Sequence, residues 1–100
     1  MAWKIVQIRT KPNADTDYEA YSDEVNAYIK TNYDDTGKRL SISVTESEDG
    51  LVLTYTAIYR DEAARNEIVS DPTIAAETIR RNNINAANGI TREVTVDEEV

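Results

Sequence analysis

The chain is 100 residues long and carries 19 acidic against 11 basic side chains, which gives a formal net charge of −8. It has no cysteine, which excludes disulfides and thiolate sites, and no histidine, which excludes a Ser-His-Asp triad and the usual zinc and iron sites. The length indicates one domain, residues 1–100. The acidic charge argues against nucleic-acid binding. No apolar run is long enough for a membrane span and no signal peptide is evident, so we expect a cytoplasmic protein.

The N-terminal half is predicted to begin with a strand and a helix. Residues 3–10 are rich in β-branched side chains and apolar on both faces, which is typical of a central strand. A helix is expected from Thr16 to Tyr33, because Thr16 and Glu19 have capping-box spacing and apolar residues recur at helical spacing. Gly37 is the residue expected to end it.

A hairpin of two strands is predicted next. Residues 40–46 alternate between apolar and polar side chains, and residues 51–60 form the following strand. A two-residue turn at Asp49-Gly50, or a four-residue turn of the same parity, pairs Val44 with Tyr55. The same register pairs Ile42 with Ala57 and Leu40 with Tyr59. It gathers the apolar side chains on one face: Leu40, Ile42, Val44, Leu53, Tyr55, Ala57 and Tyr59.

Two helical segments and a last strand complete the chain. Asp61 is expected to cap the first segment. The helix is expected to be interrupted at Asp71 and Pro72. Asp71 is a typical N-cap and Pro72 is typical of a first helical position, so a second segment begins there. This segment ends near Gly89, and residues 90–96 alternate as a strand does.

The second of these helical segments has a weak apolar stripe of Ile74, Ile79 and Ile84. Arg80 and Arg81 lie next to several asparagines. We interpret this polar end as exposed to solvent, with a contact patch for a partner as the alternative.

The order strand, helix, strand, strand, helix, strand predicts an α+β, ferredoxin-like βαββαβ fold. Right-handed crossovers place both helices on one face of a four-stranded antiparallel sheet. In element order and length the whole chain resembles the small dimeric α+β-barrel proteins of the antibiotic-biosynthesis monooxygenase, muconolactone isomerase and stress-barrel types. The resemblance implies a homodimer or higher homo-oligomer packed through open sheet faces, with a ligand pocket between sheet and helices. Many enzymatic members use a histidine, which this chain lacks.

The tyrosines have two interpretations. They are either core residues whose hydroxyls reach the rim, or the lining of a pocket for a small aromatic ligand with an arginine at its mouth. Cofactor-free oxygen chemistry in such a pocket is what the resemblance implies. The candidate ligand-binding residues are Tyr18, Tyr21, Tyr28, Tyr55, Tyr59, Arg9 and Arg60.

The sheet face opposite the apolar one is rich in hydroxyl groups. It is either a solvated face, with threonine favoured by strand propensity, or the interface of a homo-oligomer sealed by apolar residues at its edges. The candidate interface residues are Ser41, Ser43, Thr45, Val52, Thr54, Thr56 and Ile58.

The sequence favours a non-catalytic, acidic binding or assembly protein that acts as a homo-oligomer, with a basic protein surface as its possible partner. No catalytic residue, metal ligand or cofactor is predicted. The alternative is a cofactor-free small-molecule enzyme or ligand-binding protein with a tyrosine-lined pocket. A pocket of the order of several hundred Å³ with converging polar groups would favour this alternative.

Overall fold

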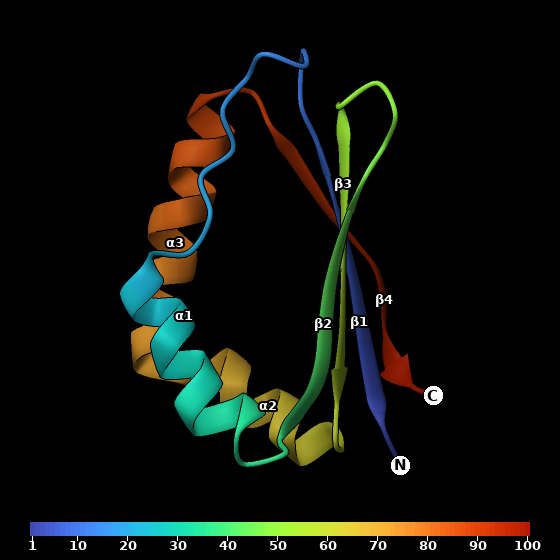
Figure 1. The fold of residues 1–100 in the computed structure, drawn as a ribbon, viewed down its shortest axis with the longest axis vertical. Helices are drawn as coiled ribbons and strands as arrows, with labels where there is room; N and C mark the ends of the chain where they lie inside the picture. The colour runs from blue at the N-terminus through green and yellow to red at the C-terminus, as the bar shows by residue number, and fades with distance from the viewer.

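Four antiparallel strands form one sheet, and the helices lie against one of its faces (Figure 1). The computed structural model describes residues 1–100. The elements in chain order are β1 (Trp3–Thr10), α1 (Asp23–Ile29), the π-helical turn η1 (Lys30–Asp34), β2 (Arg39–Glu46), β3 (Val52–Tyr59), α2 (Glu62–Ser70), α3 (Pro72–Ala87) and β4 (Thr91–Glu99).

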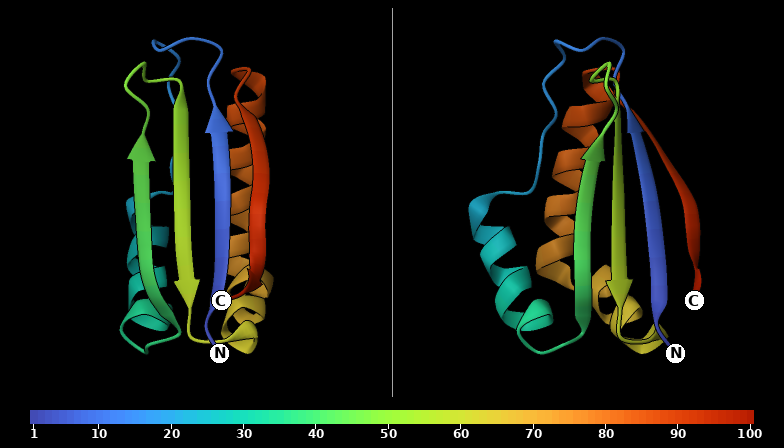
Figure 2. Two further views of the ribbon diagram at one scale, coloured as in Figure 1. Left: turned by 90° about the vertical axis from the view of Figure 1, so that its right-hand side faces the viewer. Right: turned by 45° about the vertical axis from the view of Figure 1, so that its right-hand side comes forward.

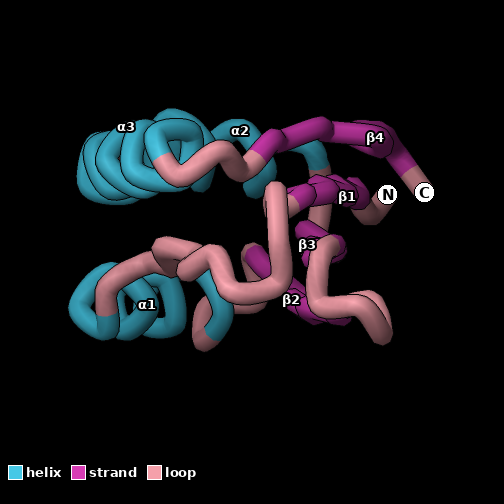
Figure 3. Tube along the Cα trace, turned by 90° about the horizontal axis from the view of Figure 1, so that it is seen from above, coloured by secondary structure: helices cyan, strands magenta, loops and turns pink.

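The strand order is β2-β3-β1-β4, which confirms the α+β, ferredoxin-like fold and the central positions of β1 and β3. Viewed from above, the sheet forms one layer and the helices the other (Figure 3). The opposite sheet face has no helix over it (Figure 2, left). None of the helices has the length and apolar character that a bilayer crossing requires.

The β2–β3 hairpin has the predicted register over most of its length. Val44 lies opposite Tyr55 and Ile42 opposite Ala57. The backbone N–H of Ser47 donates to the Val52 carbonyl at 2.9 Å, so the turn has the longer, even-numbered form. The predicted pairing of Leu40 with Tyr59 is wrong. An irregularity in β2 places Arg39 opposite Tyr59 instead, and both residues line the space beneath the helices.

The first helix begins at Asp23 rather than at Thr16. Ser22 is its cap, and its hydroxyl accepts a hydrogen bond from the Val25 backbone N–H at 3.2 Å. The predicted capping box of Thr16 and Glu19 is therefore absent. The residues before Ser22 form an irregular segment, residues 11–22, which runs along α3 (Figure 1).

Hydrogen bonds to α3 explain why the 11–22 segment is not helical. The side chain of Asn85 accepts from the Glu19 backbone N–H at 2.8 Å and donates to the Glu19 carbonyl at 3.0 Å. About two helical turns away, the Glu77 carboxylate accepts from the Ser22 N–H at 2.9 Å. The hydroxyls of Tyr21 and Thr78 are also 2.8 Å apart. Backbone groups that are satisfied in this way do not need helical partners.

Both predicted aspartate caps are present in the second half. The Asp61 carboxylate accepts from the Ala64 N–H at 2.8 Å, and that of Asp71 accepts from the Thr73 N–H at 2.9 Å. Asp71 also accepts hydrogen bonds from the hydroxyls of Tyr28 and Tyr33, at 2.8 and 2.6 Å. The start of α3 is therefore tied to α1 and η1.

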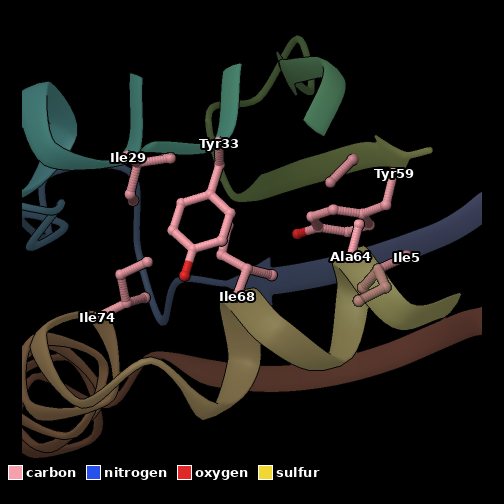
Figure 4. Close-up of a cluster of buried hydrophobic side chains, with 8 residues drawn as sticks. Ile5, Ile29, Tyr33, Tyr59, Ala64, Ile68 and Ile74 are labelled. Carbon is pink, nitrogen blue, oxygen red and sulfur yellow. The ribbon is translucent and has the colours of Figure 1, made fainter. Parts of the chain in front are cut away.

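The apolar core fills one part of the space between helices and sheet (Figure 4). Side chains from β1, β3, α1, η1, α2 and the start of α3 meet there: Ile5, Ile29, Tyr33, Ala57, Tyr59, Ala64, Ile68 and Ile74. Farther along α3 the buried residues are polar, namely Glu77, Arg81 and Asn85. The predicted stripe of Ile74, Ile79 and Ile84 is therefore wrong beyond Ile74, since Ile79 is 62% exposed.

We expect Asn85→Ala to lower the free energy of unfolding by about 1–3 kcal/mol, because it leaves the half-buried backbone N–H and carbonyl of Glu19 without partners. Urea denaturation of the variant measures this loss. Asn83→Ala on the same helix is the matched control, because Asn83 is exposed, and its effect should stay within about 0.5 kcal/mol. Equal effects of the two substitutions would contradict the assigned role of Asn85.

Candidate functional site: a cavity between the helices and the sheet

A cavity of about 330 Å³ lies between the helix layer and the sheet. Much of its wall is apolar and comes from Ile5, Ile29, Ile68, Ile74 and Ile79. A smaller hollow of about 70 Å³ shares four lining residues with the cavity and is also lined by Arg9, Ile42, Tyr55 and Ala57. The shared residues are Ile5, Gln7, Tyr59 and Arg81. We call these two spaces, which meet at the shared residues, the compartment.

Four of the chain's 11 basic residues line this compartment. Arg9 comes from β1, Arg39 from the start of β2, Arg81 from α3 and Arg92 from β4. The β1–β4 register places Arg9 directly opposite Arg92. A protein of net charge −8 thus concentrates positive charge around one internal space.

Arg9 and Arg81 are buried, with exposed fractions of 2% and 7%. Neither forms an ion pair, whereas Arg39 is paired with Asp34 at 2.6 Å. The Nε atoms of Arg9 and Arg81 have no hydrogen-bond partner. One terminal nitrogen of Arg9 donates to the Asn82 side-chain oxygen at 3.0 Å. Burying a charged group without a counter-charge is unfavourable, so these two arginines are the most unusual feature of the interior.

Burial is also the main cause that lowers the pKa of Arg9, and the nearby positive charges of Arg81 and Arg92 act in the same direction. Because a guanidinium keeps its proton in proteins, both buried arginines remain cationic donors.

Tyrosine rings pack against the two buried arginines. The Arg81 guanidinium lies 4.0 Å from the centroid of the Tyr21 ring, and that of Arg9 lies 5.8 Å from the Tyr18 ring. Tyr18 in turn packs on Tyr55 with 5.9 Å between ring centroids. Cation–π attraction partly offsets the desolvation of each arginine.

Burial raises the pKa of the hydroxyls of Tyr55 and Tyr59. These phenols therefore stay protonated at neutral pH. They can donate hydrogen bonds to a ligand but are poor general bases.

The structure brings together most of the residues predicted to bind a ligand. Tyr21 and Tyr59 line the cavity, and Arg9 and Tyr55 line the hollow. Tyr18 contacts Arg9 and Tyr55, as described above. Two predicted residues lie elsewhere: Tyr28 binds Asp71, and the exposed Arg60 pairs with Asp61 at 3.4 Å.

Arg81 is a lining residue that the local sequence pattern does not indicate, because its position beside Arg80 and several asparagines favours an exposed helix end. Arg80 is exposed and pairs with Glu77 and Glu19, but Arg81 faces the sheet. The signal was present in the spacing, because Ile74, Thr78, Arg81 and Asn85 recur at helical intervals. Arg39 and Arg92 were also missed as lining residues.

The residues predicted as an interface share the sheet face that no helix covers. The register pairs Ser41 with Ile58, Ser43 with Thr56, and Thr45 with Thr54. The β2 hydroxyl residues are exposed, and those on β3 are half-buried. The face is therefore as hydroxyl-rich as the sequence indicates.

Comparison with known proteins gives one similar structure. No family model and no curated protein matches the sequence. The structure of Rv0793 from Mycobacterium tuberculosis is 18% identical, with 98% of this chain and 99% of that chain covered and a TM-score of 0.49. The function must therefore be inferred from the cavity itself.

Lowering the pH tests the contribution of the Glu77 carboxylate, which joins α3 to the 11–22 segment through the Ser22 backbone N–H. Hydrogen bonds from Arg80 and from Ser22 lower the pKa of Glu77 from 4.5 to about 2. The stabilisation that ionised Glu77 provides is therefore complete above pH 4.5 and is lost as the pH falls toward 2.

We expect the difference in unfolding free energy between the native protein and Glu77→Gln to shrink over that pH range, as measured by urea denaturation at several pH values. Asn83→Ala, which removes no titratable group from an exposed position of α3, is the control and should keep a constant difference from the native protein over this range. A difference for Glu77→Gln that does not change with pH would show that the carboxylate charge is unimportant there.

Proposed function

We propose that this protein binds a small organic molecule in the compartment between its helices and its sheet. The observation that carries the proposal is a cavity of about 330 Å³ with apolar walls on which arginine and tyrosine side chains converge. Small-molecule sites commonly combine a mainly apolar lining with a few placed polar groups. This supports the alternative interpretation of the sequence over a protein that acts through its surface alone.

We favour binding without a chemical step. The lining side chains supply positive charge, hydrogen-bond donors and apolar surface, but no carboxylate or imidazole. The two lining tyrosines with raised pKa values, Tyr55 and Tyr59, are suited to donate hydrogen bonds rather than to remove a proton. A cofactor-free enzyme acting on a similar ligand is the runner-up.

A substitution that fills the cavity tests this proposal. Ala75 lines the cavity, whereas its neighbour Ala76 is exposed. Isothermal titration calorimetry with 2-naphthoate and with the neutral 2-naphthalenemethanol should detect binding of at least one compound. Ala75→Trp should weaken that binding at least about tenfold by occupying the space.

Ala76→Trp is the matched control and should bind as the native protein does. Ala75→Leu tests the same position if the larger side chain prevents folding. Equal binding by both tryptophan variants, or no binding to the native protein, would count against the cavity as the binding site.

We also propose that two copies of the chain associate in the cytoplasm through the uncovered sheet face. Half-buried apolar residues of the central strands, Val6, Ile8, Val52 and Ile58, lie among its hydroxyl groups. An apolar surface of this kind is typical of a contact with another protein. The remaining acidic surface would suit a basic partner.

Native mass spectrometry at several protein concentrations tests the association. We expect a dimer or a higher oligomer for the native chain and a monomer for the double variant Thr54→Glu, Thr56→Glu, because facing carboxylates repel one another across the interface. Thr31→Glu, an exposed position in η1, is the control and should not change the oligomer. A native monomer at every concentration would rule out the proposed association.

A further inference from the structure

We infer that the ligand of this compartment is an organic anion, whose carboxylate or phosphate group binds Arg9 and Arg81 while its apolar part occupies the larger cavity. The inference rests on the proposed function and specifies the class of ligand. It follows from the pairing of the arginines, from the donors left free and from the shape of the compartment.

The arginines of the chain fall into two groups. Four of them have a carboxylate partner: Arg39, Arg60, Arg65 and Arg80. The other three, Arg9, Arg81 and Arg92, form no ion pair, and all three line the compartment. None of the 19 acidic residues of the chain pairs with these three arginines. A bound anion would supply the missing counter-charge.

The free donors belong to the two most buried arginines. The Nε–H groups of Arg9 and Arg81 have no acceptor, and neither has the buried hydroxyl of Tyr18 next to Arg9. The Arg81 guanidinium lies over the Tyr21 ring, and its Nε–H remains available to a ligand. Guanidinium edges bind carboxylates and phosphates through paired hydrogen bonds.

The shape of the compartment orients such a ligand. Arg81 lines both the hollow of about 70 Å³ and the cavity of about 330 Å³. Arg9 lines the hollow as well, so the two buried, unpaired arginines meet at the smaller space, whereas the cavity has the volume for a bulkier group and five isoleucine side chains in its wall. The anionic group therefore belongs at the hollow, and an apolar or aromatic body extends into the cavity.

Calorimetry with three related compounds tests this inference. They are 2-naphthoate, 2-naphthyl phosphate and the neutral 2-naphthalenemethanol. We expect at least one anion to bind about tenfold or more tightly than the neutral compound, although the protein itself is negatively charged. Preference for the carboxylate or for the phosphate identifies the head group.

Two arginine substitutions provide a matched pair of variants. Arg81→Gln should abolish the preference for the anion, whereas Arg60→Gln, at an exposed position outside the compartment, should keep it. If Arg81→Gln does not fold, Arg92→Gln removes an unpaired charge from an exposed position and should reduce the preference. Equal binding of neutral and anionic compounds by the native protein would overturn the inference and leave the cavity proposal standing. Binding of none of the three would contradict both.

Discussion

The two hydrogen bonds between the Asn85 side chain and the backbone of Glu19 tie the irregular segment 11–22 to α3, and the position of the tyrosines beside the buried arginines depends on this tie. Asn85 is 1% exposed, so these bonds form away from water, where losing them is most unfavourable. They hold the 11–22 segment along α3 instead of letting it begin a helix. Tyr18 and Tyr21 then pack against Arg9 and Arg81.

The interior that results is divided into an apolar part and a polar part. The apolar core joins the sheet to α2 and to the start of α3, where Ile68 and Ile74 pack together with Tyr33 (Figure 4). Along the rest of α3, the buried residues are polar, namely Glu77, Arg81 and Asn85. The buried guanidinium groups of Arg9 and Arg81, which have no counter-charge, lower the stability of the protein without a ligand. This is the pattern expected of a binding site, where stability is given up for recognition.

The sequence predicts the sheet better than the helices, for a physical reason. Strand alternation and turn parity depend on residues close together in the chain, so the pairing of Val44 with Tyr55 is predictable. The start of the first helix depends on Asn85, which is distant in sequence. Because Asn85 binds the Glu19 backbone, Thr16 does not cap a helix although its spacing from Glu19 is that of a capping box. Arg9, Tyr18, Tyr21, Tyr55 and Tyr59 were predicted at the site on residue type and element order. Arg81 was missed because charged side chains are usually exposed.

A crystal structure of the protein with 2-naphthoate would show whether the buried arginines bind an anion. We expect the naphthyl ring to lie in the cavity and the carboxylate to accept hydrogen bonds from Arg9 and Arg81 at about 2.7–2.9 Å. A naphthoate bound on the outer sheet face, or one bound in the cavity with its carboxylate turned away from both arginines, would contradict this expectation.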